Sequence, residues 1–262
     1  METIQFYKYQ GTGNDFVMID NRTGFFPKKD VELIRSLCDR RFGIGGDGLI
    51  LLEDEDSADF KMVYYNSDGN ESTMCGNGGR CIVAFARDLG VIGSDTTFLA
   101  VDGMHHAHIE DRKIALQMID VPKSSVSDNG ESVFLFTGSP HHVMLVDDVK
   151  EYDVYNGGRS IRYSSLYAPG GTNVNFVEQL SEGHFRVRTY ERGVEDETLS
   201  CGTGVTAVAI AMNMTGKTDE HLISVEVEGG SLTVTFDEDD ERYYNVMLIG
   251  PAKQVFKGET TV

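Results

Sequence analysis

The sequence predicts an α+β protein made of two pseudo-symmetric repeats, each a mostly antiparallel β-sheet wrapped around a central helix. Strand-like apolar runs outnumber helical ones, and they do not alternate with helices as they would in a doubly wound sheet. In addition, a shift of 126 residues, which aligns Cys75 with Cys201, keeps many other residues in register. We therefore expect an N-terminal repeat over 1–117, completed by the tail 251–262, and a C-terminal repeat over 118–250.

The internal repeat extends well beyond the two cysteines. Three glycines of the first copy fall on glycines of the second, namely Gly76 on Gly202, Gly78 on Gly204 and Gly90 on Gly216. The segment "AVDG" at 100–103 falls on "EVEG" at 226–229, and "VMID" at 17–20 falls on "VMLV" at 143–146. No low-complexity segment or long linker separates the copies. The polar run "PKSSVSDNGES" at 122–132 is the best junction between them.

The strands and helices follow from the periodicity of apolar residues. Strand patterns occur at 16–20, 49–53, 60–65 and 113–118 in the first copy, and at 141–146, 185–190, 231–236 and 245–249 in the second. The helical segments 78–89 and 204–214 are apolar nearly all round, which predicts that each is buried at the centre of its unit. The segment 30–41 has one apolar face, and we expect it to form a helix on the surface of the first unit.

Composition and charge exclude several classes of protein. The 262 residues carry a formal net charge of −19, which disfavours binding to nucleic acid or to an anionic membrane. The longest apolar runs are far shorter than the roughly 20 residues that a membrane span needs. The N-terminus shows no secretory signal pattern, so we expect a cytoplasmic protein with reduced thiols. The four cysteines include no Cys-x2-Cys pair, so we expect no metal.

Cys75 and Cys201 each stand directly before a Gly-x-Gly sequence and a helix. A helix N-terminus presents unpaired N–H groups and partial positive charge, which favour a thiolate and bind a carboxylate. Two such ends could hold a carbon acid between two thiols, so that one removes a proton and the other returns one on the opposite face. This chemistry inverts a stereocentre without a cofactor. Cys38 and Cys81 have no counterpart at the shifted position, and we expect them to be buried structural thiols.

Five segments resemble the signature sequences of the diaminopimelate epimerase family, in the family's order and over nearly the whole chain. They are "GTGNDFVMID", "NSDGNESTMCGNGGRC", "SPHHV", "TNVNFV" and "YERGVEDETLSCGTG". The resemblance implies interconversion of LL- and meso-diaminopimelate in the synthesis of lysine and peptidoglycan precursors, with no cofactor, neither pyridoxal phosphate nor metal. It also implies a homodimer, and a site between two pseudo-symmetric units.

The resemblance also assigns roles to particular residues. Cys75 and Cys201 would be the paired acid and base. The carboxylate at the reacting centre would be held by Gly76, Asn77, Gly202 and Thr203. The distal end of the substrate would be bound by Asn14, Asn66, Asn173 and Arg192. Glu191 would help to bind and sit near Cys201, and His141 would sit near Cys75 and help manage its proton.

Two positions depart from the family pattern. Ser139 stands where an asparagine is usual, and Gly48 stands where a glutamine is common. Both changes would weaken contacts with the substrate rather than alter the type of reaction.

Other functions remain open at this stage. One is a racemase or epimerase for another amino acid, such as histidine. Proline racemase-like enzymes usually show a histidine after the first Cys-Gly, where this chain has Asn77, and a phenazine-type isomerase would lack both cysteines. A non-catalytic amino acid binding protein would not need two thiols. A redox thiol pair would normally be close in sequence.

Overall fold

The computed structural model describes residues 3–72 and 75–261, and it divides the chain into two compact units. The first unit comprises Met1–Leu116 and Gly250–Val262, and the second comprises Gln117–Ile249. The two units are described separately below.

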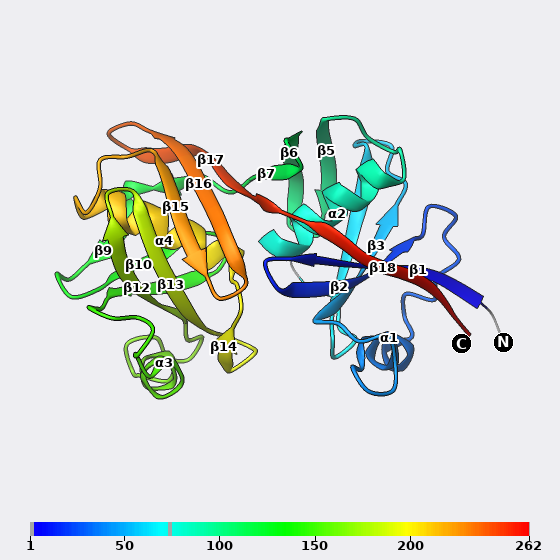
Figure 1. Ribbon diagram of the computed structural model, residues 1–262, viewed down its shortest axis with the longest axis horizontal. Helices are drawn as coiled ribbons and strands as arrows, with labels where there is room; N and C mark the ends of the chain where they lie inside the picture. Colours follow the sequence, from blue (N-terminus) through cyan, green and yellow to red (C-terminus); the bar gives the residue numbers. More distant parts are fainter. Residues whose placement is uncertain (1–2, 73–74, 262) are drawn as a thin grey trace. The chain divides into compact units, whose positions relative to one another are not determined.

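The first unit is a mixed sheet around one long helix (Figure 1). Its strands pair in the order β18 (Lys253–Thr261), β1 (Thr3–Gly11), β2 (Asn14–Asp20), β3 (Gly48–Glu53), β4 (Phe60–Asn66), β5 (Asp95–Ala100), β6 (Gly103–Glu110) and β7 (Lys113–Gln117). The pairs β2–β3 and β4–β5 are parallel and the others are antiparallel. The end of the chain therefore joins the first unit by lying beside β1.

The second unit repeats this topology (Figure 1). Its strands pair in the order β9 (Ser127–Asp128), β10 (Val133–Phe136), β11 (Pro140–Leu145), β12 (Asn173–Ser181), β13 (His184–Glu191), β15 (Leu222–Val227), β16 (Gly230–Glu238), β17 (Arg242–Pro251) and β8 (Val121–Pro122), and β14 (Asp196–Thr198) adds to β13. The parallel pairs β11–β12 and β13–β15 take the places of the two parallel pairs in the first unit. This correspondence confirms the predicted α+β fold with two repeats.

The central helices of the two units are related by the same shift of 126 residues. Helix α2 spans Gly76–Asp88 and helix α4 spans Gly202–Met214. Nearly every residue of each is buried, as the apolar pattern predicts. The second glycine of each Gly-x-Gly leaves space for the sheet. A Cβ atom at Gly78 would lie 3.1 Å from Ile50 Cδ1, and one at Gly204 would lie 2.5 Å from Asn175 Oδ1.

The outer helices are less visible in the sequence. Helix α1 spans Val31–Cys38, begins at the N-cap Asp30, and ends earlier than the predicted segment 30–41. Its counterpart α3, Val154–Arg162, has no sequence-based prediction, because its apolar face is short: only Val154 and Gly158 are buried, and Ile161 packs partly buried against the core. All eight predicted strand segments fall on observed strands.

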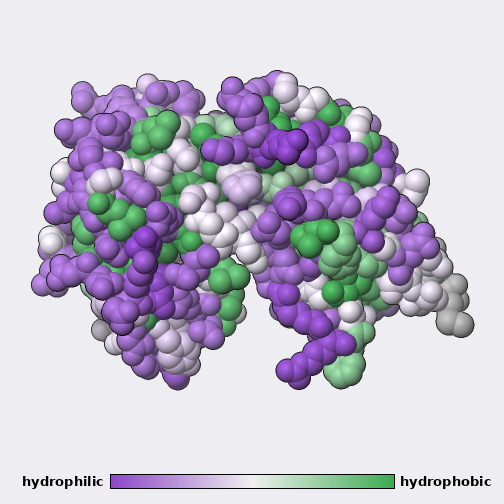
Figure 2. All heavy atoms as spheres, in the orientation of Figure 1, coloured by the Kyte–Doolittle hydropathy of each residue, from purple (hydrophilic) through white to green (hydrophobic). Residues whose placement is uncertain are grey.

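The polar run 122–132 lies inside the second unit, where it forms the end of β8, the 3₁₀ turn η1 (Lys123–Ser125) and β9. Hydrophilic residues cover most of the visible face of each unit, in keeping with the net charge of −19 (Figure 2). None of the helices that the structure describes in residues 3–72 and 75–261 is long and apolar enough to cross a membrane.

Candidate active site

Cys75 is the N-cap of α2 in the first unit, with extended backbone angles. The first bond of the helix runs from Gly79 N to Cys75 O at 2.7 Å. The N–H groups of Gly76 and Asn77 therefore precede the ladder of backbone hydrogen bonds within the helix. Cys75 is half-buried, and its thiol is not in a disulfide. The geometry is that of a thiol beside an anion-binding helix end.

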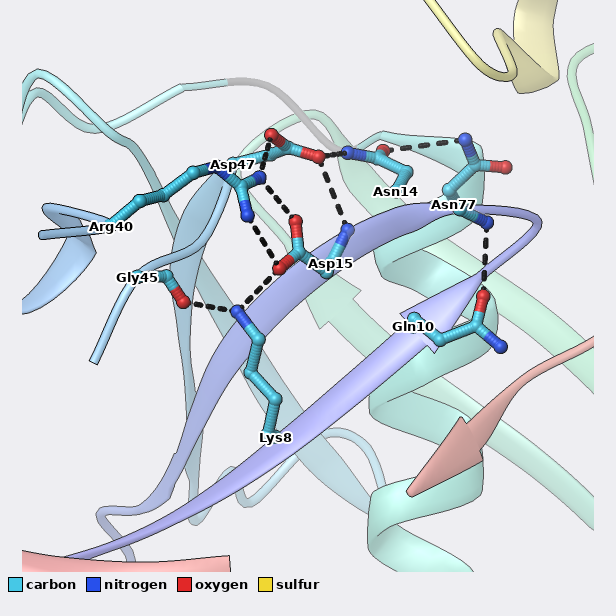
Figure 3. Close-up of polar contacts among 9 residues, drawn as sticks. Lys8, Gln10, Asn14, Asp15, Arg40, Gly45, Asp47 and Asn77 are labelled. Atoms are coloured by element: carbon cyan, nitrogen blue, oxygen red, sulfur yellow. Dashed lines mark hydrogen bonds and ion pairs between the residues drawn. The ribbon is translucent and has the colours of Figure 1, made fainter. Parts of the chain in front are cut away.

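Asn14 joins Cys75 and Asn77 at this end of the first unit. The thiol Sγ of Cys75 donates to Asn14 Oδ1 at 3.6 Å, and Asn77 Nδ2 donates to the same oxygen at 3.3 Å. The two asparagines face each other in Figure 3. Asn66 is the last residue of β4, and it pairs with Gly48 of β3. Gly48 in turn pairs with Phe16 of β2, the strand that begins at Asn14. The Asn66 side chain is exposed, and its backbone closes a turn with Asn70.

A buried guanidinium, which the sequence reasoning missed, lies beneath this helix end. Arg80 has no exposed surface, and it donates to Gly76 O at 3.4 Å, to Asn77 Oδ1 at 2.8 Å and to Thr12 Oγ1 at 3.3 Å. Within residues 3–72 and 75–261, no carboxylate forms an ion pair with it. Burial lowers the pKa of Arg80 to about 10, and interaction with Cys81 and Cys75 opposes that shift. The sequence did contain a signal for this buried charge, namely an arginine within a helical segment that is otherwise apolar.

Cys201 occupies the equivalent position in the second unit, as the N-cap of α4. The first helical bond runs from Val205 N to Cys201 O at 2.9 Å, so the N–H groups of Gly202 and Thr203 precede the ladder. The Sγ atom of Cys201 lies 3.5 Å from Thr203 Oγ1 in a hydrogen bond. Thr203 in turn lies 2.9 Å from His141 Nε2. One hydroxyl therefore links the thiol to the imidazole.

His141 is fully buried and neutral. Burial, and then the charge of Arg192, lower the pKa of His141 to about 3. Since Asn175 Nδ2 donates to His141 Nδ1 at 3.2 Å, the ring proton lies on Nε2 and faces the hydroxyls of Ser139 and Thr203. The contacts of His141 lie in the second unit, on the side of Cys201. Its role beside Cys75 stays a prediction.

Asn173 and Arg192 meet in the same half. Asn173 Oδ1 accepts from Arg192 N at 2.8 Å, and Asn173 Nδ2 donates to Ser139 Oγ at 3.1 Å. The exposed guanidinium of Arg192 reaches only Gly170 O, at 3.5 Å, among the hydrogen bonds of the described residues. Glu191 accepts from Thr198 Oγ1 at 2.9 Å. Asn173 therefore links Arg192 to Ser139, and Ser139 in turn bonds to Thr203 at the N-terminus of α4. Glu191 immediately precedes Arg192 in the chain.

The two departures from the family pattern have structural explanations. A Cβ atom at Gly48 would lie 2.5 Å from Tyr65 O and 2.6 Å from the ring of Tyr64, so a longer side chain does not fit there. Ser139 Oγ lies 2.9 Å from His141 Nε2 and 3.1 Å from Thr203 Oγ1. Its hydroxyl therefore completes the network around the imidazole.

The remaining thiols are structural, as predicted. Cys38 and Cys81 are buried, and burial raises the pKa of each to about 12. In the part of the chain that the structure describes, no group of three His, Cys, Asp or Glu side chains could hold a metal ion.

A family model and curated relatives of this chain carry the same description. The family model described as diaminopimelate epimerase matches residues 6–121 and 133–255. The chain is 60% identical over 260 residues to the diaminopimelate epimerase of Flavobacterium psychrophilum, covering 99% of this chain and 100% of that one. It is 41% identical to the diaminopimelate epimerase of Aquifex aeolicus, covering 97% of each.

Solved structures support the fold. A phenazine biosynthesis protein of the PhzF family from Bacillus anthracis aligns over 100% of both chains with a TM-score of 0.80 and 15% identity. A hydroxyproline epimerase from Agrobacterium vitis aligns over 98% of this chain and 92% of its own, with a TM-score of 0.68 and 14% identity. At such low identity these likenesses show a shared fold alone.

Proposed function

Because the chain belongs to the diaminopimelate epimerase family, we propose that it is the enzyme that interconverts LL- and meso-diaminopimelate, without a cofactor, by proton transfer at one α-carbon. One observation supports the chemistry most directly. Cys75 and Cys201 are each the N-cap of the buried central helix of their unit. A non-catalytic binding protein would have no use for a thiol at both positions.

In the proposed mechanism both half-sites act on the same α-carbon. The thiolate of one cysteine takes the α-proton, and the electron pair left on the carbon is delocalised into the adjacent carboxylate. The thiol of the other cysteine then gives its proton to the opposite face and becomes a thiolate. The N–H groups at the starts of α2 and α4 would stabilise the carboxylate as its charge grows. The backbones of Gly76, Asn77, Gly202 and Thr203 would supply them.

The distal amino acid group of the substrate needs donors for a carboxylate and acceptors for an ammonium. Arg192 suits the carboxylate, because its exposed guanidinium has no ion pair in residues 3–72 and 75–261 and its planar fork can bind in a bidentate way. We assign Glu191 and the asparagines Asn14, Asn66 and Asn173 to the remaining contacts.

The proposal is tested with purified protein, LL-diaminopimelate and chiral chromatography, with no cofactor added and a chelator present. We expect meso-diaminopimelate to form. Cys75→Ala and Cys201→Ala should each abolish the reaction, whereas the control Cys38→Ala should retain it, since Cys38 is a buried core thiol. Turnover of another amino acid in place of diaminopimelate, or activity in either active-site cysteine variant, would refute the proposal.

We further propose that the protein is a cytoplasmic homodimer that supplies meso-diaminopimelate for lysine and peptidoglycan synthesis. The cytoplasm is supported by four cysteines that form no disulfide. Light scattering after gel filtration tests the dimer, and a mass of one 29.0 kDa chain would exclude it.

A further inference from the structure

A charged network surrounds Asn14 in the first unit, beyond the residues assigned to the site (Figure 3). Asn14 Nδ2 donates to Asp47 Oδ2 at 2.5 Å, and the backbone N–H of Asp15 donates to the same oxygen at 3.1 Å. Arg40 bridges the carboxylates of Asp15 and Asp47 at 2.6 and 2.7 Å. The result is a loop carboxylate held in place against Asn14.

The two ends of this network determine the orientation of both amides. A carboxylate can only accept hydrogen bonds, so Asp47 requires the NH₂ group of Asn14 to face it. A guanidinium can only donate, so Arg80 requires the carbonyl oxygen of Asn77 to face it, at 2.8 Å. The NH₂ of Asn77 is then left to donate to Asn14 Oδ1, at 3.3 Å. Both ends therefore impose the same direction of hydrogen-bond donation: Arg80 donates to Asn77, Asn77 donates to Asn14, and Asn14 donates to Asp47.

We propose that Asp47 is a positioning residue that fixes the amide of Asn14 so that its carbonyl oxygen faces the thiol of Cys75. In this orientation Asn14 accepts from the S–H group, which stabilises Cys75 in its protonated form. Asn14 also presents an acceptor, and not a donor, to anything bound beside Cys75. Within the proposed function, that suits an ammonium group of the substrate better than a carboxylate.

The loop that carries Asp47 does not depend on Asp47 alone. Lys8 is buried, pairs with Asp15 at 2.6 Å, and also donates to the carbonyl of Gly45. Burial alone would raise the pKa of Asp15, but hydrogen bonds from Arg40 and Lys8 outweigh it and lower the pKa to about 2. Asp15 therefore keeps Arg40 and the loop in place when Asp47 is substituted.

Direct electrostatic effects of Asp47 on Cys75 are weak by comparison. The Asp47 side chain is 42% exposed, and water screens its charge. The groups that interact electrostatically with Cys75 include Arg80 and Cys81, both on α2, and Cys81 stays neutral because burial raises its pKa to about 12. Removal of Asp47 should therefore act on Cys75 mainly through the hydrogen bond to Asn14.

The test is the pH dependence of alkylation by iodoacetamide, followed at Cys75 and at Cys201 by peptide mass spectrometry. Asp47→Ala should release the Asn14 amide and move the pH midpoint of Cys75 alkylation down by about half a unit, or about threefold in thiolate fraction below the midpoint. Asp47→Asn removes the charge but keeps an acceptor, and should move the midpoint less. Cys201 is the control within the same molecule, and its midpoint should not move down with that of Cys75.

A double-mutant cycle completes the test. In an Asn14→Ala background, Asp47→Ala should cause no further shift at Cys75, because the group through which it acts is gone. Equal shifts in Asp47→Asn and Asp47→Ala, additive shifts in the double variant, an unmoved Cys75 midpoint, or a matching shift at Cys201 would each overturn the inference. Alkylation requires no turnover, so failure to epimerise diaminopimelate would refute the proposed function and leave this result intact.

Discussion

Acid should destabilise the protein through buried neutral histidines well before its carboxylates titrate. His142 is buried, and burial lowers its pKa from 6.5 to about 4. Its Nδ1 bonds to Tyr167 OH at 2.7 Å, while Nε2 has no hydrogen-bond partner in the part of the chain that the structure describes. A proton on the folded protein would therefore create a buried cation with an unpartnered N–H group. His141, whose pKa falls to about 3, behaves in the same way.

The sign and size of the effect follow from linkage. Below pH 6.5 the unfolded chain takes up protons that the folded protein does not, so stability falls as pH falls from 6.5 toward the folded pKa. At pH 5.5 the loss is about 1.4 kcal/mol for each histidine, or about 2.8 kcal/mol for the two. The glutamine of His142→Gln stays neutral at every pH. Between pH 7.5 and 5.5 the free energy of unfolding of this variant should therefore fall by about 1.4 kcal/mol less than that of the wild type.

The assay is urea unfolding at pH 7.5, 6.5 and 5.5, with the free energy of unfolding extrapolated to zero urea. The values at pH 7.5 measure the direct cost of the substitution, so only the change with pH is compared. If the wild type and His142→Gln lose the same free energy between pH 7.5 and 5.5, His142 is not held neutral in the fold and the reasoning is wrong.

Three further predictions concern the site. Arg192→Lys should lose most of the activity on diaminopimelate with unchanged circular dichroism, because an ammonium cannot reproduce the bidentate fork; near-normal turnover would remove Arg192 from the distal pocket. In heavy water, early product should carry deuterium at the inverted carbon while unreacted substrate stays largely unlabelled; extensive label in the substrate, measured by mass spectrometry, would argue against separate acid and base. Gly204→Ala should lower the melting temperature and the activity, since its Cβ would lie 2.5 Å from Asn175 Oδ1; an unchanged melting curve would show that β12 can move away from α4.

The sequence by itself determined the duplicated architecture and the positions of the two thiols. Each repeat encodes its central helix locally, by an apolar stretch after a Cys-Gly-x-Gly turn, so the shift that aligns Cys75 with Cys201 also aligns α2 with α4. The eight predicted strands were visible for the same reason, because their apolar periodicity lies within a few consecutive residues.

The tertiary structure alone decided the electrostatic character of each half-site. Neither the neutrality of His141 nor the lowered pKa of Arg80 can be read from local periodicity, because both depend on packing by strands distant in sequence. The same holds for the direction of the Asn14 amide, which is decided by Asp47 on another loop. Hydrogen-bond polarity and desolvation arise only when distant segments meet, and they determine which form of each group the folded protein presents.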